Sequence, residues 1–360
     1  MMTKTLLVGT RKGLLVFEKS PSQGSWKVAN DGFLGIPVCM VYVDEREDQW
    51  WVALDHGHWG MKLHRSVNRG QSWDEVEAPK YPEGTLIKED VPASLHYIWA
   101  FAHGGKEYPG KLYIGTEPGG LFEMNGDGFI LNESLWNQPS RTDQWFGGGR
   151  DYPGIHSIVV DPQNSDHIYV GISCAGVFET ADRGANWQVR NDGLRADFLP
   201  DPHAEVGHDP HLLLASPTNP KVMWQQNHCG IFRSINGGAR WQEVSDTDGP
   251  ANFGFALAVD DQDENRAWVA PAVSDVTRVA VDQALCICRT DDAGQSWLTF
   301  REGLPQEHCY DIVYRHGLVA SGNDVIFGTT TGNLFASENA GESWSPISHH
   351  LAMVYCLCFA

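Results

Sequence analysis

The chain has 360 residues, and 42% of them are apolar, which is enough to bury a globular core. Its 26 Lys and Arg residues are outnumbered by 46 Asp and Glu residues, so a formal net charge of −20 excludes nucleic acid and anionic membranes as favoured partners. No apolar run reaches the roughly 18 residues of a membrane helix and the N-terminus carries no signal-peptide pattern, so we expect a cytoplasmic protein whose eight cysteines are reduced.

A repeated turn motif runs along the whole chain. Five segments follow the pattern Ser/Thr-x-Asp/Asn-x-Gly-x-x-Trp, and they end at Trp73, Trp187, Trp241, Trp297 and Trp344. Two weaker copies end at Trp26 and Phe129, so neighbouring motif ends are 47 to 58 residues apart. This spacing is typical of a four-stranded propeller blade. The sequence therefore predicts an all-β fold, a seven-bladed β-propeller in which residues 1–360 form a single domain.

The third position of this motif holds Asp or Asn for a structural reason. Its side chain accepts hydrogen bonds from the backbone of its own turn, while Gly takes a positive φ and the Trp ring packs back on the sheet. We therefore expect scaffold roles, rather than catalytic ones, for Asn68, Asp182, Asn236, Asp292 and Asn339.

Short β-rich runs around glycine-containing loops precede the motifs, as in LLVGTRKGLLVF near the N-terminus and VIFGTTTGNLFAS near the C-terminus. Each blade is expected to run from an inner strand through a second and a third strand to the motif and an outer strand. The chain begins with a second strand, whereas its last residues, MVYCLCFA, resemble an inner strand. We predict that these two ends complete one blade together, because this pairing removes a free sheet edge.

Alignment of the inner strands on their ends identifies one inward position in each blade. These positions hold Cys39, His96, His156, His211, Phe255, Tyr310 and Val354 or Tyr355. Converging imidazoles near a carboxylate suit a divalent transition metal such as Zn, Mn or Fe. We predict a metal site formed by His96, His156 and His211, with His228 as the fourth ligand. The alternative is a neutral polar channel in which the histidines bond to water and to one another.

Loops on the same face are expected to bind a small-molecule or saccharide substrate. The longest connections, residues 130–154 and 191–209, flank the blades of two of these histidines, and long loops in compact domains commonly form lids or binding rims. Aromatic, Arg and acidic side chains there suit a sugar-like or carboxylated ligand. The glycines 147–149 are a candidate anion-binding nest. The predicted substrate-binding residues are His56, His58, Arg141, Trp145, Arg150, Asp151, Arg195, Glu205, His208, Asp275 and Arg278. The predicted general acids or bases are Glu117, Asp209 and Tyr310.

The motifs and blades resemble the BNR/Asp-box repeat superfamily, which includes sialidases, two-propeller xyloglucanases and sortilin-type receptors. Segments such as WFGGGRDYPGIHSI and WQQNHCGIFRS are similar to bacterial single-propeller proteins labelled glycosyl hydrolase or exo-sialidase-like. This resemblance implies a propeller fold and glycosidase-like hydrolysis. The Arg-Ile-Pro motif of sialidases does not occur in this sequence.

Three functions are open at this point. The first is a metal-dependent hydrolase or lyase that acts at the channel mouth. The second is a metal-free glycoside hydrolase that uses rim carboxylates such as Asp151, Asp197, Glu205 or Asp209. The third is a non-catalytic propeller that binds a glycan or a protein. The first is the leading hypothesis. The unequal loops, which concentrate around the histidine-bearing blades, argue against the third.

Overall fold

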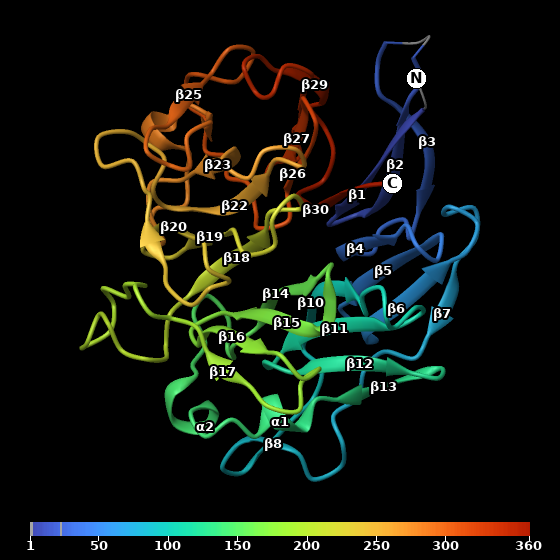
Figure 1. Ribbon diagram of the computed structural model, residues 1–360. Coiled ribbons are helices and arrows are strands. Elements are labelled where there is room, and N and C mark those ends of the chain that lie inside the picture. Colours follow the sequence, from blue (N-terminus) through green and yellow to red (C-terminus); the bar gives the residue numbers. More distant parts are fainter. Residues whose placement is uncertain (1–2, 22–23) are drawn as a thin grey trace.

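The computed structural model describes residues 3–21 and 24–360. In this part of the chain, seven four-stranded antiparallel sheets are arranged as a β-propeller (Figure 1), which confirms the predicted fold class. The weak motif copy that ends at Trp26 includes Ser22 and Gln23, which lie outside the described residues, as do residues 1–2. None of the described helices is long and apolar enough to cross a membrane.

The strands of each blade follow one another from the central channel outward. Blade 1 contains β30 (Val354–Phe359), β1 (Lys4–Thr10), β2 (Gly13–Lys19) and β3 (Lys27–Gly32). Blade 2 contains β4 (Val38–Asp44), β5 (Gln49–His56), β6 (Gly60–Ser66) and β7 (Asp74–Val76). Blade 3 contains β10 (Tyr97–His103), β11 (Leu112–Glu117), β12 (Leu121–Asn125) and β13 (Gly128–Leu131). Blade 4 contains β14 (Ile155–Asp161), β15 (Asn164–Ile172), β16 (Gly176–Thr180) and β17 (Gln188–Val189).

The remaining blades have the same order of strands. Blade 5 contains β18 (Pro210–Ala215), β19 (Met223–Asn227), β20 (Gly230–Ser234) and β21 (Gln242–Glu243). Blade 6 contains β22 (Gly254–Val259), β23 (Ala267–Pro271), β24 (Ile287–Thr290) and β25 (Leu298–Phe300). Blade 7 contains β26 (Leu318–Ser321), β27 (Asp324–Gly328), β28 (Leu334–Ser337) and β29 (Ser345–Ser348). The connections carry a hairpin of β8 (Leu86–Lys88) and β9 (Val91–Pro92) and the short helices α1 (Glu133–Trp136), α2 (Arg141–Gln144) and η1 (Val281–Gln283).

Both chain ends share blade 1, as predicted. The last strand, β30, pairs antiparallel with β1, so that Leu7 lies opposite Cys358 and Gly9 opposite Cys356. The backbone N–H of Ala360 also donates to the carbonyl oxygen of Thr5 at 3.0 Å. The C-terminal strand therefore closes the ring and covers the sheet edge of β1 that would otherwise be open.

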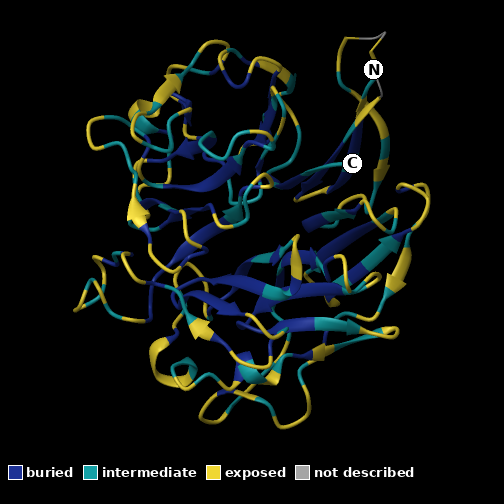
Figure 2. Cartoon of the chain, viewed as in Figure 1, coloured by how far each residue is buried: buried dark blue, intermediate teal, exposed yellow. Residues whose placement is uncertain are grey.

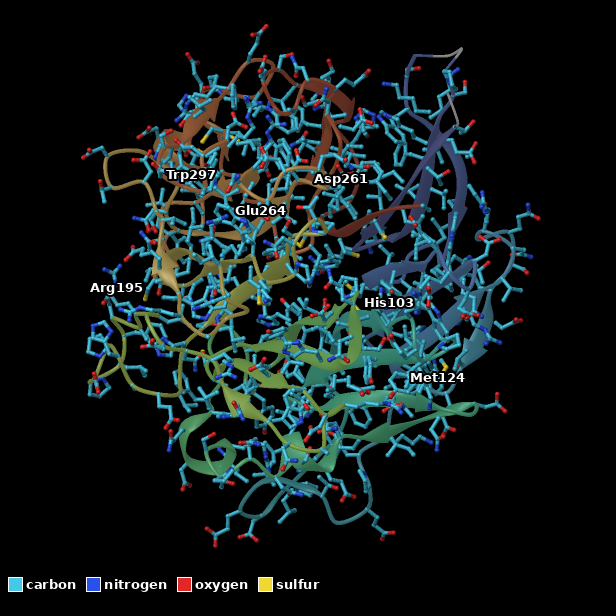
Figure 3. The ribbon with its side chains drawn as sticks, in the orientation of Figure 1. His103, Met124, Arg195, Asp261, Glu264 and Trp297 are labelled. Atoms are coloured by element: carbon cyan, nitrogen blue, oxygen red, sulfur yellow. The ribbon has the colours of Figure 1, made fainter. Side chains whose placement is uncertain are left out.

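In blades 4 to 6 the Trp of the repeated turn motif donates a hydrogen bond to the preceding blade or to the connection that follows it. In blade 6, Thr290 Oγ1 accepts a hydrogen bond from the Gly294 N–H at 2.8 Å, and Asp292 Oδ1 accepts one from the Ser296 N–H at 2.9 Å. The Trp297 Nε1–H, labelled in Figure 3, donates to the carbonyl oxygen of Val244 in blade 5 at 2.7 Å. These hydrogen bonds assign Asp292 to the scaffold, since its carboxylate is used by its own turn.

Six inner strands carry a β-bulge at the same height, and the extra residue faces the channel. The register shifts leave one unpaired residue in each strand, and these residues are Cys39, Trp99, His156, His211, Phe255 and Tyr355. A bulge re-aims a side chain out of the regular alternation. The prediction for blade 3 is therefore wrong: Trp99, not His96, holds the equivalent position. Blade 3 lacks the Asp-Pro or Ser-Pro ending used for alignment, so its register was misplaced by three residues.

Blade 7 departs from the other six. The segment that contains Tyr310 was expected to be its inner strand, but β26 begins at Leu318. Residues 309–316 instead run as a loop, and His316 forms an isolated parallel bridge with Cys356. Because residues 309–316 form a loop and not a strand, their side chains do not alternate between the two faces of a sheet as they approach the channel.

The hydrophobic core lies within and between the blades, where the strands are most buried (Figure 2). The largest fully buried side chains are Trp224, Trp268, Phe122, Phe178, Phe232, Phe327 and Phe335. Burial of one such ring contributes about 1.5–3 kcal/mol relative to exposure. Side chains from the connections also join the core, among them Leu135, Trp145 and Val206.

Candidate functional site

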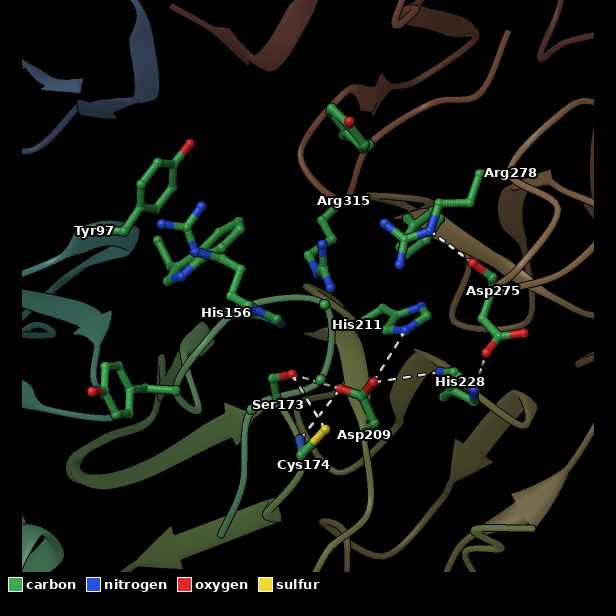
Figure 4. Close-up of a pocket in the computed structure, with 18 of the residues that line it drawn as sticks. Tyr97, His156, Ser173, Cys174, Asp209, His211, His228, Asp275, Arg278 and Arg315 are labelled. Atoms are coloured by element: carbon green, nitrogen blue, oxygen red, sulfur yellow. Dashed lines mark hydrogen bonds and ion pairs between the residues drawn. The ribbon is translucent and has the colours of Figure 1, made fainter. Parts of the chain in front are cut away.

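A cavity of about 500 Å³ lies where the bulge residues meet the loops of the channel mouth (Figure 4). All six bulge residues line it, and they are joined by the predicted residues Arg150, Asp209, His228, Asp275 and Arg278. Phe146, from the loop after α2, and Phe198, from the connection 191–209, face each other at its rim with 6.2 Å between ring centroids. The two long connections therefore meet over the cavity, as expected for binding loops.

Asp209, His211 and His228 form the polar centre of this cavity. Their ligand atoms all lie within 4.8 Å of one another, and the His211 and Asp209 side chains are almost fully buried. Asp209 Oδ2 is 3.5 Å from His211 Nε2 and 3.5 Å from His228 Nδ1. The other oxygen, Oδ1, accepts hydrogen bonds from the Ser173 hydroxyl at 2.8 Å and from the Cys174 N–H at 3.3 Å. These two donors fix the carboxylate so that Oδ2 faces the histidines.

The protonation of His211 follows from its surroundings. Its Nδ1 lies 2.6 Å from the carbonyl oxygen of Gly254. A carbonyl oxygen only accepts hydrogen bonds, so Nδ1 must carry the proton. Burial lowers the pKa of His211, which leaves Nε2 unprotonated at neutral pH.

Asp209 is ionised in this arrangement. Burial opposes its charge, but the positive charge of Arg315 and the hydrogen bonds that Ser173 and Cys174 donate to Oδ1 favour the carboxylate, so its pKa lies well below the usual range. The imidazole lone pair of His211 thus faces a carboxylate oxygen at 3.5 Å. Two electron-rich atoms in this arrangement favour a positive ion that contacts both.

Two more histidines stand beside this centre. His156 is 3% exposed, and its Nδ1 has no hydrogen-bond partner among the described residues. Burial lowers the pKa of His156 well below its usual value, and Arg315 adds to this effect. His316 donates from Nε2 to the backbone carbonyl of His156 at 3.0 Å, and burial lowers the pKa of His316 to about 4. Both imidazoles are therefore neutral at physiological pH.

Three guanidinium groups line the same cavity in this acidic protein. Arg150 forms an ion pair with the buried Glu117, and its Cζ lies 4.6 Å from the centroid of the Tyr97 ring. Arg278 and Arg315 lie over the ring of Phe255, with Cζ at 5.4 Å and 5.2 Å from its centroid. Burial lowers the pKa of Arg315 to about 10, so this side chain is still positively charged at neutral pH.

The glycines 147–149 pass close to these charged groups. A Cβ at Gly148 would lie 2.9 Å from Cys174 Sγ and 3.6 Å from Asp209 Oδ2, and one at Gly149 would lie 3.3 Å from Arg278 Nη2. None of the three has a positive φ, so they do not form the predicted anion nest, which needs alternating backbone conformations. Because glycine has no side chain, this loop can pass close to Cys174 and Arg278, where larger residues would crowd the site.

The structure does not assemble the predicted trio of metal ligands. His96 lies at the start of blade 3 and packs against Tyr152, with 5.1 Å between ring centroids, outside the cavity lining. His156 lines the cavity but does not belong to the cluster of Asp209, His211 and His228. Only His211 and His228 of the four predicted ligands come together, because the bulge places Trp99 where His96 was expected.

Two predicted acids or bases also lie elsewhere. The Tyr310 side chain is 58% exposed, because residues 309–316 form a loop, and it does not line the cavity. Glu117 is buried and binds Arg150, so it positions that guanidinium rather than facing the cavity itself.

Other predicted substrate-binding residues lie around the site without lining it. His56 ends strand β5, and His58 lies in the β5–β6 turn, where it packs on Trp59. Glu205 is exposed. His208 is buried and bonds to the Ala204 carbonyl, while Arg195 pairs with Asp197 and Glu243 at the periphery (Figure 3).

Three further predicted residues, Arg141, Trp145 and Asp151, line a smaller cavity of about 230 Å³. Arg141 lies over the Trp136 ring at 3.9 Å and donates hydrogen bonds to the carbonyl oxygens of Ile87 and Leu86 in the β8–β9 hairpin. Trp145 packs on Phe178, and Asp151 is exposed nearby. Arg141 and Trp145 therefore hold this connection against the β8–β9 hairpin and blade 4.

Several cavity residues were not predicted from the sequence. They are Tyr97, Trp99, Phe146, Tyr152, Ser173, Cys174, Phe198, Phe253, Tyr314, Arg315 and His316. Trp99 could have been found by counting five residues back from Gly104, which directly follows its strand. Arg315 carried no such signal, since its position depends on a loop that lacks the repeat pattern.

Comparison with known proteins identifies the fold. No family model matches the chain. A xyloglucanase of Hypocrea jecorina (strain QM6a) is 20% identical over 284 residues, which is 71% of this chain and 28% of that protein. An ancestral GH74 enzyme superimposes with a TM-score of 0.58 at 18% identity over 86% of this chain and 38% of its own. The periplasmic gluconolactonase PpgL of Pseudomonas aeruginosa superimposes with a TM-score of 0.62 at 14% identity, over 99% of both chains. The chain thus spans less than half the length of the first two proteins, and these similarities show a shared β-propeller fold.

Proposed function

We propose that this propeller is a hydrolase or lyase for a small polar, sugar-like or carboxylated molecule, with a divalent transition metal held by Asp209, His211 and His228. The observation that carries this proposal is the unprotonated Nε2 of His211 facing Asp209 Oδ2 at 3.5 Å, because a cation would satisfy both atoms.

The donor set suits Zn, Mn or Fe. One carboxylate and two imidazoles are the ligands that catalytic sites for these metals use, and three protein ligands leave a coordination position open. When bound there, such an ion would polarise a substrate oxygen or lower the pKa of a water molecule. The surrounding residues support this role: the Gly254 carbonyl orients the His211 ring, and Ser173 orients the Asp209 carboxylate.

The chain also supplies groups for proton transfer and for binding. His156 is neutral and has an unpartnered Nδ1 at the cavity wall, so we assign it as the proton acceptor. Asp275 Oδ2 lies 3.6 Å from His228 Nε2 and holds that imidazole from the opposite side. Trp99, Phe253 and Phe255 give the cavity apolar faces on which a sugar ring would stack.

The comparisons support the substrate class only through the names of the related folds, a xyloglucanase and a gluconolactonase. A cytoplasmic location remains part of the proposal, supported by eight cysteines that are all free. A metal-free glycoside hydrolase is the second candidate, because Asp209 and Asp275 both lie in the cavity on either side of His228.

Metal analysis and chelation separate the two candidates. Protein purified without chelator should contain about one equivalent of a transition metal per chain, and activity found in a screen of sugar lactones and glycosides should disappear with chelator and return with metal. Less than roughly a tenth of an equivalent, with no binding on titration, would refute the metal. Turnover that persists in excess chelator would support the metal-free glycosidase instead. A single stoichiometric protein partner, without turnover, would support a non-catalytic binding propeller.

A further inference from the structure

Arg278 and Arg315 are two positive side chains that form no ion pair with any described residue, in a chain that has 46 acidic and 26 basic residues. Arg278 donates from Nε to the backbone carbonyl of Asp275 at 2.9 Å, and no carboxylate of the described residues pairs with it. Arg315 makes neither a hydrogen bond nor an ion pair with any described residue, and its Nε is buried. Arg150 differs from both, since Glu117 neutralises it.

The two guanidinium groups come from different loops to one place. Arg278 lies in the β23–β24 connection and Arg315 in the loop before β26, yet both stack on Phe255. Arg315 also lies over the Trp99 ring at 5.4 Å. Figure 4 shows both on the side of His211 that faces away from Asp209. Like charges gathered in a cavity repel one another, so an anion that contacts both is the favoured occupant.

We propose that Arg278 and Arg315 form a carboxylate-binding subsite, and that the ligand of this cavity is therefore a small sugar acid. The carboxylate would lie between the two guanidinium groups, with the sugar ring against Trp99 and Phe255 and its hydroxyl groups toward Asp209, His211 and His228. The placement of the reacting group rests on the proposed function, whereas the anion subsite rests on the arginines alone.

A carboxylate fits this place better than a phosphate. Planar guanidinium groups match the two oxygens of a carboxylate with paired hydrogen bonds. Guanidinium groups also pair with phosphate, but built phosphate sites commonly add backbone N–H groups at a helix N-terminus or in a nest. The glycines 147–149 form no such nest, and no helix of the described residues contributes to the cavity lining. The cavity volume of about 500 Å³ is large enough for a small sugar acid.

Titration calorimetry with four probes tests the subsite. D-glucuronate and D-gluconate carry the carboxylate, D-glucose lacks a charge and D-glucose 6-phosphate carries a phosphate. We expect at least one of the two acids to bind, at least about tenfold more tightly than glucose, and R278Q and R315Q each to weaken that binding about ten- to a hundredfold. R315K should fall between R315Q and the unmodified protein, because lysine keeps the charge but loses the planar fork.

Arg65 provides the matched control. Its Cζ lies 5.7 Å from the Trp51 ring and its Nε is buried without a partner, but it does not line the cavity. R65Q should therefore bind the acid as tightly as the unmodified protein. The subsite is refuted if neither acid binds, if glucose or glucose 6-phosphate binds as tightly as the acids, or if R278Q and R315Q leave acid binding unchanged.

Titration of the same variants with Mn²⁺ distinguishes this inference from the proposed function. R315Q should keep its affinity for Mn²⁺ within a fewfold, because Arg315 is not a ligand. Acid binding without any Mn²⁺ binding would refute the metal and leave the subsite standing. Mn²⁺ binding without acid binding would refute the subsite and leave the metal standing.

Discussion

Replacement of Asp209 by Asn tests the central claim that this carboxylate and His211 hold a metal ion. Asn keeps an oxygen that accepts the hydrogen bonds from Ser173 and Cys174, and it turns an N–H donor toward His211 Nε2. In chelator this new hydrogen bond offsets the loss of attraction between Asp209 and Arg315. We therefore expect D209N to change the free energy of unfolding by less than about 2 kcal/mol without metal.

The metal response should differ strongly between the two proteins. A ligand present at about a hundredfold its Kd stabilises the native state by about 2.7 kcal/mol. With an unfolding entropy of about 2.1 cal/mol/K per residue, this raises the Tm of a chain of 360 residues by about 3–4 °C. If D209N weakens metal binding at least about a hundredfold, the same metal concentration should raise its Tm by less than about 0.5 °C.

Differential scanning fluorimetry with Zn²⁺, Mn²⁺ or Fe²⁺, after removal of bound metal, measures this difference. D311N is the matched control, since Asp311 is also buried and accepts hydrogen bonds from Thr331 N and Asn333 Nδ2, but no histidine contacts it. D311N should keep the full metal-induced rise in Tm. An equal rise in D209N would refute the ligand role of Asp209, and a loss of more than about 4 kcal/mol in chelator would show that its charge is structural instead.

Three other predictions concern the scaffold. Urea unfolding should show that G328A destabilises the ring by about 1–3 kcal/mol, because a Cβ there would lie 2.5 Å from Val354 Cγ1. G128A is the control and should be nearly neutral, because the new Cβ would meet open space. His316 has a folded pKa of about 4, so it stays neutral when the unfolded state takes up a proton below about pH 6.5, and the free energy of unfolding falls between pH 6.5 and 4. H316Q should remove about 2 kcal/mol of this loss at pH 5. A pH profile that is unchanged in H316Q would contradict this assignment. D292A should cost about 1 kcal/mol in thermal unfolding while metal and acid binding stay unchanged, and a loss of either binding would show that the motif carboxylate reaches the site.

The local pattern of the sequence was sufficient for the architecture and for part of the site. The turn motif recurs because each blade needs the same hairpin. The bulge position, four or five residues before the end of each bulged inner strand, recurs because each bulge needs the same register. This pattern placed Cys39, His156, His211 and Phe255 on the channel wall, and it left Val354 or Tyr355 as alternatives in blade 1. The shared composition of the loops also indicated Arg150, Asp209, His228, Asp275 and Arg278.

The combination of these residues into one site was decided only by the tertiary structure. His96 and Tyr310 were misplaced because blade 3 lacks the usual strand ending and blade 7 replaces part of a strand by a loop. Arg315 faces the cavity only because that loop crosses the ring beside β30, which closes the propeller from the other end of the chain. The sequence repeat reflects hydrogen bonds and burial within a single blade. Contacts across the axis depend on ring closure and loop packing, and these join residues that are far apart in the sequence.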